Sequence, residues 1–203
     1  MNKNLIIVFC KNLLFGKVKT RLAKSKGKSN ALKVYSLLIE KTISVLKEID
    51  QEVAVFHSDF IPNNKDWSFA KYQKIQHGKN LGNRMENAFK WGFNMNYTNI
   101  CIVGTDLWNI EKKIFKDTFH YLKKNDVVFG PASDGGYYLL GLKKLNNSIF
   151  SIDSWGSSKV LEDSINQMSC NNSVYFLQEL NDLDTEDDLN KHKDLIKKLQ
   201  EFK

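Results

Sequence analysis

One aspartate follows a strongly apolar run of the sequence. Residues 99–103 read Asn-Ile-Cys-Ile-Val, and Gly104, Thr105 and Asp106 come directly after them. In open α/β sheets, ligands bind beyond the carboxyl ends of the strands, so an acid at such an end faces a binding site. Carboxylate oxygens are preferred ligands of Mg²⁺ and Mn²⁺. We therefore predict that Asp106 binds Mg²⁺ or Mn²⁺, the alternative being an aspartate that only caps the next helix.

A basic segment follows the first apolar run of the chain, residues 5–10, and reads Phe-Gly-Lys-Val-Lys-Thr-Arg-Leu over residues 15–22. Gly16 lets the backbone approach a ligand closely, and the alternating cations can surround a diphosphate. The segment is not a Walker loop, because the Gly-Lys-Ser/Thr ending is absent. A solvated basic loop is the alternative interpretation. The predicted phosphate ligands here are Gly16, Lys17, Lys19 and Arg21.

A second glycine-flanked segment, residues 78–85, reads Gly-Lys-Asn-Leu-Gly-Asn-Arg-Met. It places Arg84 near the start of a predicted helix, where exposed N–H groups favour anions. Arg84 is therefore a candidate ligand for a phosphate or a carboxylate. An ordinary helix start with a surface arginine is the alternative.

Residues 130–141, Gly-Pro-Ala-Ser-Asp-Gly-Gly-Tyr-Tyr-Leu-Leu-Gly, join two strand candidates. The paired glycines permit a backbone that β-carbons would forbid, and they hold Asp134 at a strand end. A tight turn would need only Asp-Gly, so the second glycine and the aromatic pair favour a shaped pocket. Asp134 is a candidate for orienting an acceptor or serving as its base.

A run of acids, Leu-Asp-Thr-Glu-Asp-Asp-Leu, occupies residues 183–189. Its pattern predicts a helix start with Asp184 as the N-cap and Asp187 at N3. Asp184 lies just before that helix and is a candidate second metal ligand.

The elements that must position these side chains alternate between strand and helix. The gap between the strands predicted at 126–131 and 136–141 is too short for a helical crossover, so one of them should run antiparallel or leave the sheet. The fold class is α/β with a mixed, mainly parallel sheet. Strands are predicted at residues 5–10, 52–57, 71–76, 99–106, 126–131, 136–141 and 173–177, and helices at 29–49, 81–89, 110–124, 158–169 and 185–202, with a loop over 11–28.

Composition limits the class of protein. The chain has 203 residues, of which 42% are hydrophobic, and this predicts a single globular domain over residues 1–203. No run approaches the roughly 18 apolar residues of a membrane span, which predicts a soluble, cytoplasmic protein. The net charge of +7 favours an acidic partner, whether nucleic acid, an anionic membrane or a phosphorylated small molecule. The three cysteines and four histidines show no metal-ligand spacing.

Taken together, the motifs resemble a bacterial glycosyltransferase-like family of GT-A fold that is often encoded beside radical-SAM enzymes and linked to arsenosugar biosynthesis. They are more distantly similar to phospholactate guanylyltransferase and the molybdenum-cofactor nucleotidyltransferases. The resemblance spans nearly the whole chain in order. The residues that carry it are Lys11, Gly16 to Leu22, Leu81-Gly82, Arg84-Met85, Gly104 to Asp106, Gly130-Pro131, Asp134 to Tyr138, Ser154-Trp155 and Asp184-Thr185.

The resemblance implies a three-layer, Rossmann-like nucleotide-diphospho-sugar transferase domain, with Lys11 and the basic loop on the nucleotide phosphates and Asp106 on the metal. Two reactions stay open: glycosyl transfer from a nucleoside diphosphate sugar to a small acceptor, and nucleotidyl transfer from a nucleoside triphosphate to a phosphorylated small molecule. A non-catalytic basic module is a third reading. Strand-end acids argue against nucleic acid, because carboxylates repel its backbone. The oligomeric state is not predicted.

Overall fold

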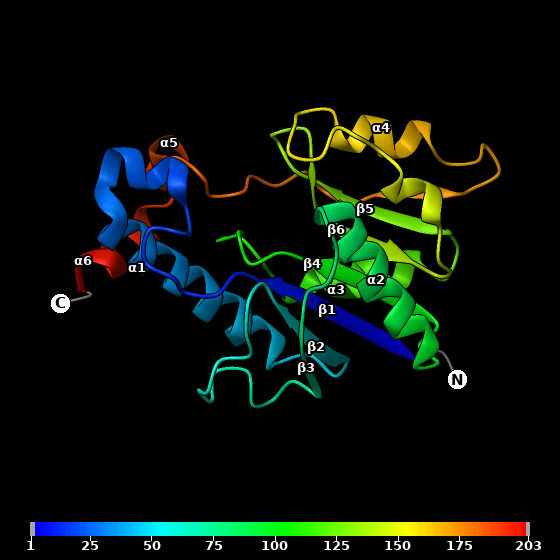
Figure 1. Cartoon of the computed structure of the whole chain (residues 1–203), viewed down its shortest axis with the longest axis horizontal. Helices are drawn as coiled ribbons and strands as arrows, with labels where there is room; N and C mark the ends of the chain where they lie inside the picture. Colours follow the sequence, from blue (N-terminus) through cyan, green and yellow to red (C-terminus); the bar gives the residue numbers. More distant parts are fainter. Residues whose placement is uncertain (1–2, 202–203) are drawn as a thin grey trace.

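Seven strands join into one mixed sheet in the computed structural model, which describes residues 3–201 (Figure 1). Their order across the sheet is β3-β2-β1-β4-β6-β5-β7. The strands are β1 (Asn4–Cys10), β2 (Glu52–His57), β3 (Tyr72–Ile75), β4 (Asn99–Val103), β5 (Val127–Pro131), β6 (Tyr137–Leu142) and β7 (Val174–Phe176). The helices are α1 (Thr20–Leu46), α2 (Leu81–Asn94), α3 (Lys112–Tyr121), η1 (Asn147–Phe150), α4 (Val160–Asn166), α5 (Glu186–Asn190) and α6 (Lys193–Glu201).

Strand β6 runs antiparallel to both of its neighbours, β4 and β5. The other pairs in the sheet, β1 with β2, β1 with β4, β2 with β3 and β5 with β7, are parallel. The short segment between β5 and β6 can make only a tight reversal, since a parallel neighbour needs a long crossover. The predicted α/β class and mixed, mainly parallel sheet are therefore confirmed.

Helices cover both faces of the sheet and make three layers. Alternate residues of β1 point to opposite faces: Ile6 and Val8 pack in the core cluster with α1 and α3, and Leu5 and Ile7 pack in the cluster with α2. The four side chains are fully buried. A strand covered on both faces must be apolar throughout, which is why β1 reads as a continuous hydrophobic run.

The strand order reverses between β1 and β4. The chain passes from β1 outward to β2 and β3, and then returns to place β4 on the other side of β1. The loops that leave the carboxyl ends of β1 and β4 diverge, and the crevice between them is where doubly wound sheets bind ligands. Lys11 follows β1 directly, and Asp106 lies three residues beyond β4.

Helix α1 begins nine residues earlier than predicted. The predicted loop over 11–28 is helical from Thr20 onward, and Ser29, the expected N-cap, lies inside the helix. Gly27 interrupts the helical backbone with φ 81° and ψ 156°. The early turns escape sequence prediction because only Leu22 and Ala23 among them are apolar, yet Leu22 is fully buried and holds the turn on the core.

The acidic C-terminal region also differs from prediction. Thr185, not Asp184, is the N-cap of α5, and its partner in the capping box is Asp188, not Asp187. The expected single helix is divided into α5 and α6, and its predicted last residue, Phe202, lies outside the described residues. This shift by one residue leaves the Asp184 side chain free of the helix cap.

Residues 3–201 contain neither a membrane-spanning helix nor a disulfide bond. No helix there is long and apolar enough to cross a membrane. Cys10, Cys101 and Cys170 are free thiols, and the first two are buried as small apolar groups.

Replacing Gly27 by alanine tests the kink in α1. A β-carbon there would meet no atom within 4 Å, so its cost comes only from holding an L-residue at φ 81°. We expect Gly27→Ala to lower the free energy of unfolding by about 1 kcal/mol. Ser29→Ala, two residues away in regular helix, is the control and should be neutral in urea denaturation. Equal stability of the two variants would contradict the kink.

Candidate functional site

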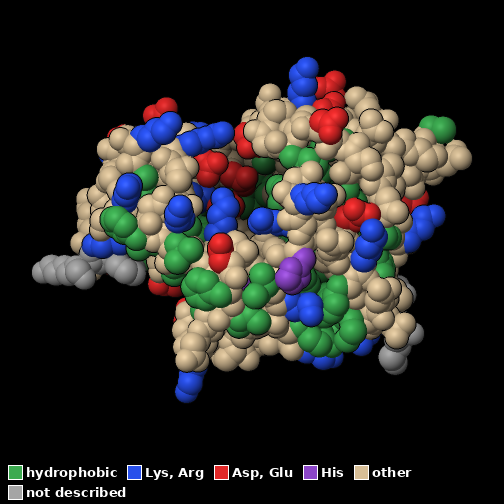
Figure 2. All heavy atoms as spheres, in the orientation of Figure 1, with side chains coloured by type: hydrophobic (Ala, Val, Ile, Leu, Met, Phe, Trp, Pro, Cys, Tyr) green, Lys and Arg blue, Asp and Glu red, His purple; other side chains and the backbone are tan. Residues whose placement is uncertain are grey.

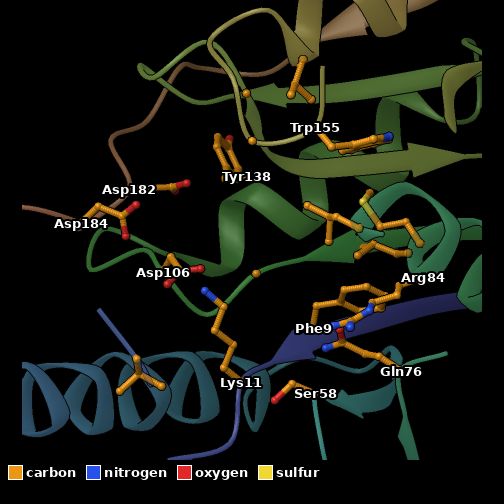
Figure 3. Close-up of a pocket in the computed structure, with 18 of the residues that line it drawn as sticks. Phe9, Lys11, Ser58, Gln76, Arg84, Asp106, Tyr138, Trp155, Asp182 and Asp184 are labelled. Carbon is orange, nitrogen blue, oxygen red and sulfur yellow. The ribbon is translucent and has the colours of Figure 1, made fainter. Parts of the chain in front are cut away.

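A pocket of about 880 Å³ opens where β1 and β4 end (Figure 3). Figure 2 shows the same region as a hollow that contains both acidic and basic side chains. In Figure 3, acidic side chains gather at one end of the pocket and Phe9, Gln76 and Arg84 at the other. The polar and charged lining includes Lys11, Asn12, Lys17, Arg21, Ser58, Asp59, Gln76, Asn80, Arg84, Asp106, Asp134, Asp182 and Asp184.

Lys19 is buried between two of these acids. Its Nζ donates to Asp106 Oδ1 and, at 3.0 Å, to Asp184 Oδ1. The Lys19 side chain is only 3% exposed, whereas those of Asp106 and Asp184 are 32% and 41% exposed. Lys19 thus joins Asp106 and Asp184, the two predicted metal ligands, although they are far apart in the sequence.

Lys19 and Asp106 hold each other in their charged forms. Burial by itself would lower the pKa of Lys19, but the two carboxylates raise it above its ordinary value. Burial would likewise raise the pKa of Asp106, but Lys19, with a smaller contribution from Lys11, holds it below its ordinary value. The ammonium predicted to face a phosphate therefore faces two carboxylates, and a phosphate contact of Lys19 stays a prediction.

Tyr35 of α1 braces the two loops that flank the crevice. Its buried hydroxyl accepts a hydrogen bond of 2.9 Å from the backbone N–H of Lys11 and shares one of 2.7 Å with Thr105 Oγ1. These partners follow β1 and β4 respectively, so one side chain sets the spacing of the crevice. The sequence analysis missed this role, because Tyr35 looks like any other apolar position of an amphipathic helix.

Asp182 is a further acid of the pocket that the sequence analysis missed. Its Oδ1 is buried and has no hydrogen-bond partner. Burial, followed by the charges of Asp106, Asp134 and Asp184, raises its pKa to about 7. The spacing Asp182-Leu183-Asp184 was an available signal, since alternate residues of an extended segment point to the same side.

The remaining predicted cations border the pocket with their charges largely free. Within residues 3–201, no ion pair involves Lys11, Lys17 or Arg84, and Arg21 lies 3.9 Å from Asp184. Lys11 points toward the acidic end in Figure 3. Arg84 Nε donates to the Gly78 carbonyl at 3.3 Å. Such cations are available to an anionic ligand.

Gly16 lies apart from the other members of the basic segment. It adopts φ 74°, a conformation that favours glycine, and the side chain of Lys28 passes within 3.2 Å of where its β-carbon would be. It is not among the residues that line the pocket. Gly16 therefore forms a turn in the loop after β1, outside the lining of the pocket.

Asp134 stands on the rim of the pocket, in the turn between β5 and β6. Its Oδ1 accepts a hydrogen bond of 2.9 Å from Gly136 N–H. Gly135 has φ 89°, and a β-carbon there would lie 2.0 Å from the Ser158 carbonyl oxygen, so only glycine fits. The steric need for glycine is therefore seen at Gly135, whereas Gly136 has no positive φ and a β-carbon there would lie 3.1 Å from Asp134 Oδ1.

Trp155 lines the pocket where α2 begins. Its ring packs on the backbone of α2 at Gly82, where a β-carbon would approach to 2.4 Å. Its Nε1–H is buried without a partner, as is the hydroxyl of Ser154. Trp155 and Arg84 thus both line the pocket, away from its acidic end.

The acidic end fits a divalent metal. Mg²⁺ commonly takes one or two protein carboxylates and completes its shell with substrate phosphates and water. Asp106 and Asp184 already share one cation, Lys19, and Asp182 contributes an unsatisfied oxygen close by. Among residues 3–201, no three Asp, Glu, His or Cys side chains converge on one position. The carboxylates present are too few to enclose a metal ion by themselves. They therefore fit an ion whose remaining ligands come from a bound phosphate and water.

Sequence comparison assigns the family. The profile of the family described as "Uncharacterized protein conserved in bacteria (DUF2064)" matches residues 42–157, more than half of the chain. The chain belongs to this family. The DUF2064 match includes Asp106, Asp134 and Trp155 and excludes the basic segment and Asp184. No curated protein matches the chain.

Solved structures resemble this DUF2064 protein in fold. A Desulfovibrio desulfuricans protein provisionally described as a nucleotide-diphospho-sugar transferase has a TM-score of 0.84 and 24% identity, covering 98% of this chain and 99% of its own. The 4-diphosphocytidyl-2C-methyl-D-erythritol synthase of Anaerococcus prevotii gives 0.60 and 11%, covering 97% and 99%. A Mycobacterium tuberculosis protein solved with manganese gives 0.55 and 11%, covering 94% and 97%.

Removing Lys19 tests the buried ion cluster of this DUF2064 protein. Lys19→Met should lower the free energy of unfolding by about 2–4 kcal/mol in chelator, because it leaves the clustered carboxylates without their cation. Lys26→Met is the matched control: Lys26 pairs with Glu186 near the surface, and its loss should cost less than about 1 kcal/mol. Similar losses for both variants, measured by urea denaturation, would rule the cluster out.

Asp182 predicts a pH dependence of stability. Its pKa is about 7 in the folded protein and near the ordinary 3.8 when unfolded, so the folded state binds more protons between these values. Stability should therefore fall as pH rises through this interval. In chelator, Asp182→Asn should raise Tm over wild type at about pH 8 and change it little at about pH 5. Asp50→Asn, at an exposed residue, is the control; parallel pH profiles for all three proteins would refute the assignment.

Proposed function

We propose that this protein is a cytoplasmic metal-dependent transferase that uses a nucleotide-activated donor, and that it transfers a glycosyl group from a nucleoside diphosphate sugar to a small acceptor. The observation that carries the proposal is the composition of one pocket. Its acidic end, at Asp106 and Asp184, adjoins cations that have no acidic partner within residues 3–201. A metal-bound diphosphate is complementary in charge to both groups, since its metal ion would face the carboxylates and its phosphates would face the cations.

The cations and the acids have separate tasks in this proposal. Lys11, Lys17 and Arg21 bind the phosphates, and their positive charge stabilises the diphosphate as it leaves. Lys19 keeps Asp106 ionised and beside Asp184, so that the two carboxylates are ready to hold Mg²⁺ or Mn²⁺. When bound there, the metal would act as a Lewis acid that neutralises the negative charge of the leaving group.

The transfer itself exchanges one C–O bond for another. An acceptor hydroxyl oxygen attacks the anomeric carbon, and the bond from that carbon to the diphosphate breaks with its electron pair on the phosphate oxygen. The acceptor proton passes to the Asp134 carboxylate, which the turn between β5 and β6 holds at the rim of the pocket. Arg84 and the Trp155 face offer recognition for the sugar or the acceptor.

Nucleotidyl transfer is the second candidate. The structural likeness to 4-diphosphocytidyl-2C-methyl-D-erythritol synthase, at a TM-score of 0.60, supports it. A phosphate oxygen of the acceptor would then attack the α-phosphorus of a nucleoside triphosphate, and pyrophosphate would leave. The higher TM-score of 0.84 to the Desulfovibrio protein favours glycosyl transfer. A non-catalytic basic module is a poorer fit, because the half-buried acids of the pocket would repel a polyanion.

A thermal-shift panel tests the donor class. Nucleoside mono-, di- and triphosphates and nucleotide sugars are compared with and without Mn²⁺, because a ligand that binds the folded state raises Tm. Hits are then incubated with candidate acceptors and monitored for nucleoside diphosphate or pyrophosphate, which separates the two reactions. If no nucleotide raises Tm in the presence of Mn²⁺, the proposal fails.

The metal assignment predicts a specific loss of binding. Asp106→Asn and Asp184→Asn should each weaken the Mn²⁺-dependent binding of the best nucleotide by about a hundredfold or more, in titration calorimetry. Asp187→Asn is the control: Asp187 is an exposed acid of α5 that does not line the pocket, and its variant should bind normally. Unchanged Mn²⁺-dependent binding by Asp106→Asn would exclude Asp106 as the ligand.

A further inference from the structure

Four large apolar side chains are exposed beside the mouth of the pocket. They are Leu13, Phe15, Phe60 and Ile61, with exposed fractions of 42%, 65%, 47% and 47%, and we call them the apolar lip. Residues 3–201 contain seven large exposed apolar side chains, so more than half of them lie on these two loops. Their concentration at one place distinguishes them from the scattered apolar residues of an ordinary surface.

A buried asparagine joins the two loops of the lip. Asn12 Nδ2 donates to the Phe60 carbonyl at 2.8 Å, and Asn12 Oδ1 accepts from the backbone N–H of Asp59 at 2.9 Å. The Asn12 N–H donates to Ser58 Oγ at 3.0 Å. The loop after β1 and the loop after β2 are therefore held together, and the lip is a defined surface.

The lip continues directly into the pocket. Asn12 and Leu14 line the pocket, whereas their sequence neighbours Leu13 and Phe15 do not. In the second loop, Ser58 and Asp59 line it, and Phe60 and Ile61 do not. The loop after β2 thus turns polar groups inward and large apolar groups outward, whereas the loop after β1 turns Asn12 and Leu14 inward and Leu13 and Phe15 outward.

Unpaired lysines surround the lip. Lys11, Lys17 and Lys28 form no ion pair with any described residue, and the Lys28 side chain lies over Gly16, next to Phe15. Asp59 is an acid of the same surface, and its carboxylate accepts a hydrogen bond from Ser58. Figure 2 shows hydrophobic and basic side chains interspersed beside the hollow. The surface is therefore apolar and locally cationic.

We propose that the apolar lip docks the protein onto an anionic lipid surface. Aromatic and aliphatic side chains on loop tips enter the headgroup region, while Lys28, which lies outside the pocket beside Phe15, faces the lipid phosphates. The net charge of +7 adds long-range attraction to such a surface. Lys28 and the outward Phe15 and Ile61 then serve one interaction, whereas Lys11 and Lys17 remain in the pocket.

Charge complementarity favours lipid over a second copy of the chain. In a symmetric dimer through the lip, Lys17 and Lys28 of both copies would face one another, and Asp59 is the acid of that surface available to offset them. The outward direction of the four side chains also distinguishes the lip from a groove for a soluble apolar ligand, which would enclose them. An anionic bilayer supplies both the apolar phase and the counter-charge.

Docking would set the substrate class of the pocket, a step that rests on the proposed function. With the lip in the headgroup region, the mouth of the pocket faces the lipid surface. The acceptor would then be an amphiphile whose reacting hydroxyl or phosphate lies at headgroup level. A soluble nucleotide donor would reach the phosphate-binding cations from the aqueous side.

Co-sedimentation with vesicles tests the docking. Wild type is compared on phosphatidylcholine alone and on phosphatidylcholine with phosphatidylglycerol, and should bind the anionic vesicles. The double variant Phe15→Ser with Ile61→Ser should bind about tenfold or more weakly, and Lys28→Gln about fivefold more weakly. Met95→Ser, at the exposed opposite end of α2, and Lys116→Gln on α3 are matched controls that should bind as wild type.

The same proteins are assayed for Mn²⁺-dependent nucleotide binding and for oligomeric state by light scattering. Vesicle binding that is absent, or equally reduced in the controls, overturns the docking. A dimer that the lip variant dissociates, without vesicle binding, overturns it in favour of a second copy. Nucleotide binding lost in the lip variant, without vesicle binding, assigns the lip to the pocket instead. Lip-dependent vesicle binding without any nucleotide binding would uphold the docking and refute the proposed function.

Discussion

The ammonium group of Lys19 between Asp106 and Asp184 is the contact on which the site depends. It connects three segments: the start of α1, the loop after β4 and the chain before α5, with partners 87 and 165 residues from Lys19. Taking an ammonium out of water is costly, and here two carboxylates offset that cost. The same contact concentrates negative charge, since Asp182 lies near enough for these acids to raise its pKa. The same cluster therefore connects three segments of the chain and raises the pKa of a neighbouring carboxyl group.

Hydrogen bonds behind the wall of the pocket fix the shape of the pocket. They leave the lysines that line it without an acidic partner in the described chain. Tyr35 ties the backbone after β1 to Thr105, and Asn12 ties it to the loop after β2. Both anchoring side chains are buried, so their hydrogen bonds are sheltered from water. Lys11 and Lys17 project from the loops thus braced and have no acidic partner in the described chain. Preorganised cations of this kind are what a diphosphate needs.

The fold accommodates either transfer chemistry for a physical reason. Glycosyl and nucleotidyl transfer both expel a phosphate-containing leaving group, so the same cations and carboxylates would serve both. In the proposed function, the choice of acceptor would fall to the remainder of the surface: Arg84 and Trp155 inside the pocket, and the lip outside it. The family profile reaches Trp155 but neither Lys19 nor Asp184, so the ion cluster lies on segments that this match leaves out.

The sequence predicted the seven strands, the mixed sheet and an aspartate at the carboxyl end of the strand that begins at Asn99, because these follow from local apolar runs and from a gap too short for a crossover; the strand ends at Val103 rather than at Asp106. The sequence could not determine the start of α1, where one buried leucine outweighs a polar segment, or the N-cap at Thr185, one residue from the expected position. Folding brings Lys19 to the carboxylates, places Asp182 near them and joins the two loops of the lip through Asn12. Those outcomes depend on groups brought together from distant parts of the chain, and no local pattern encodes such distances.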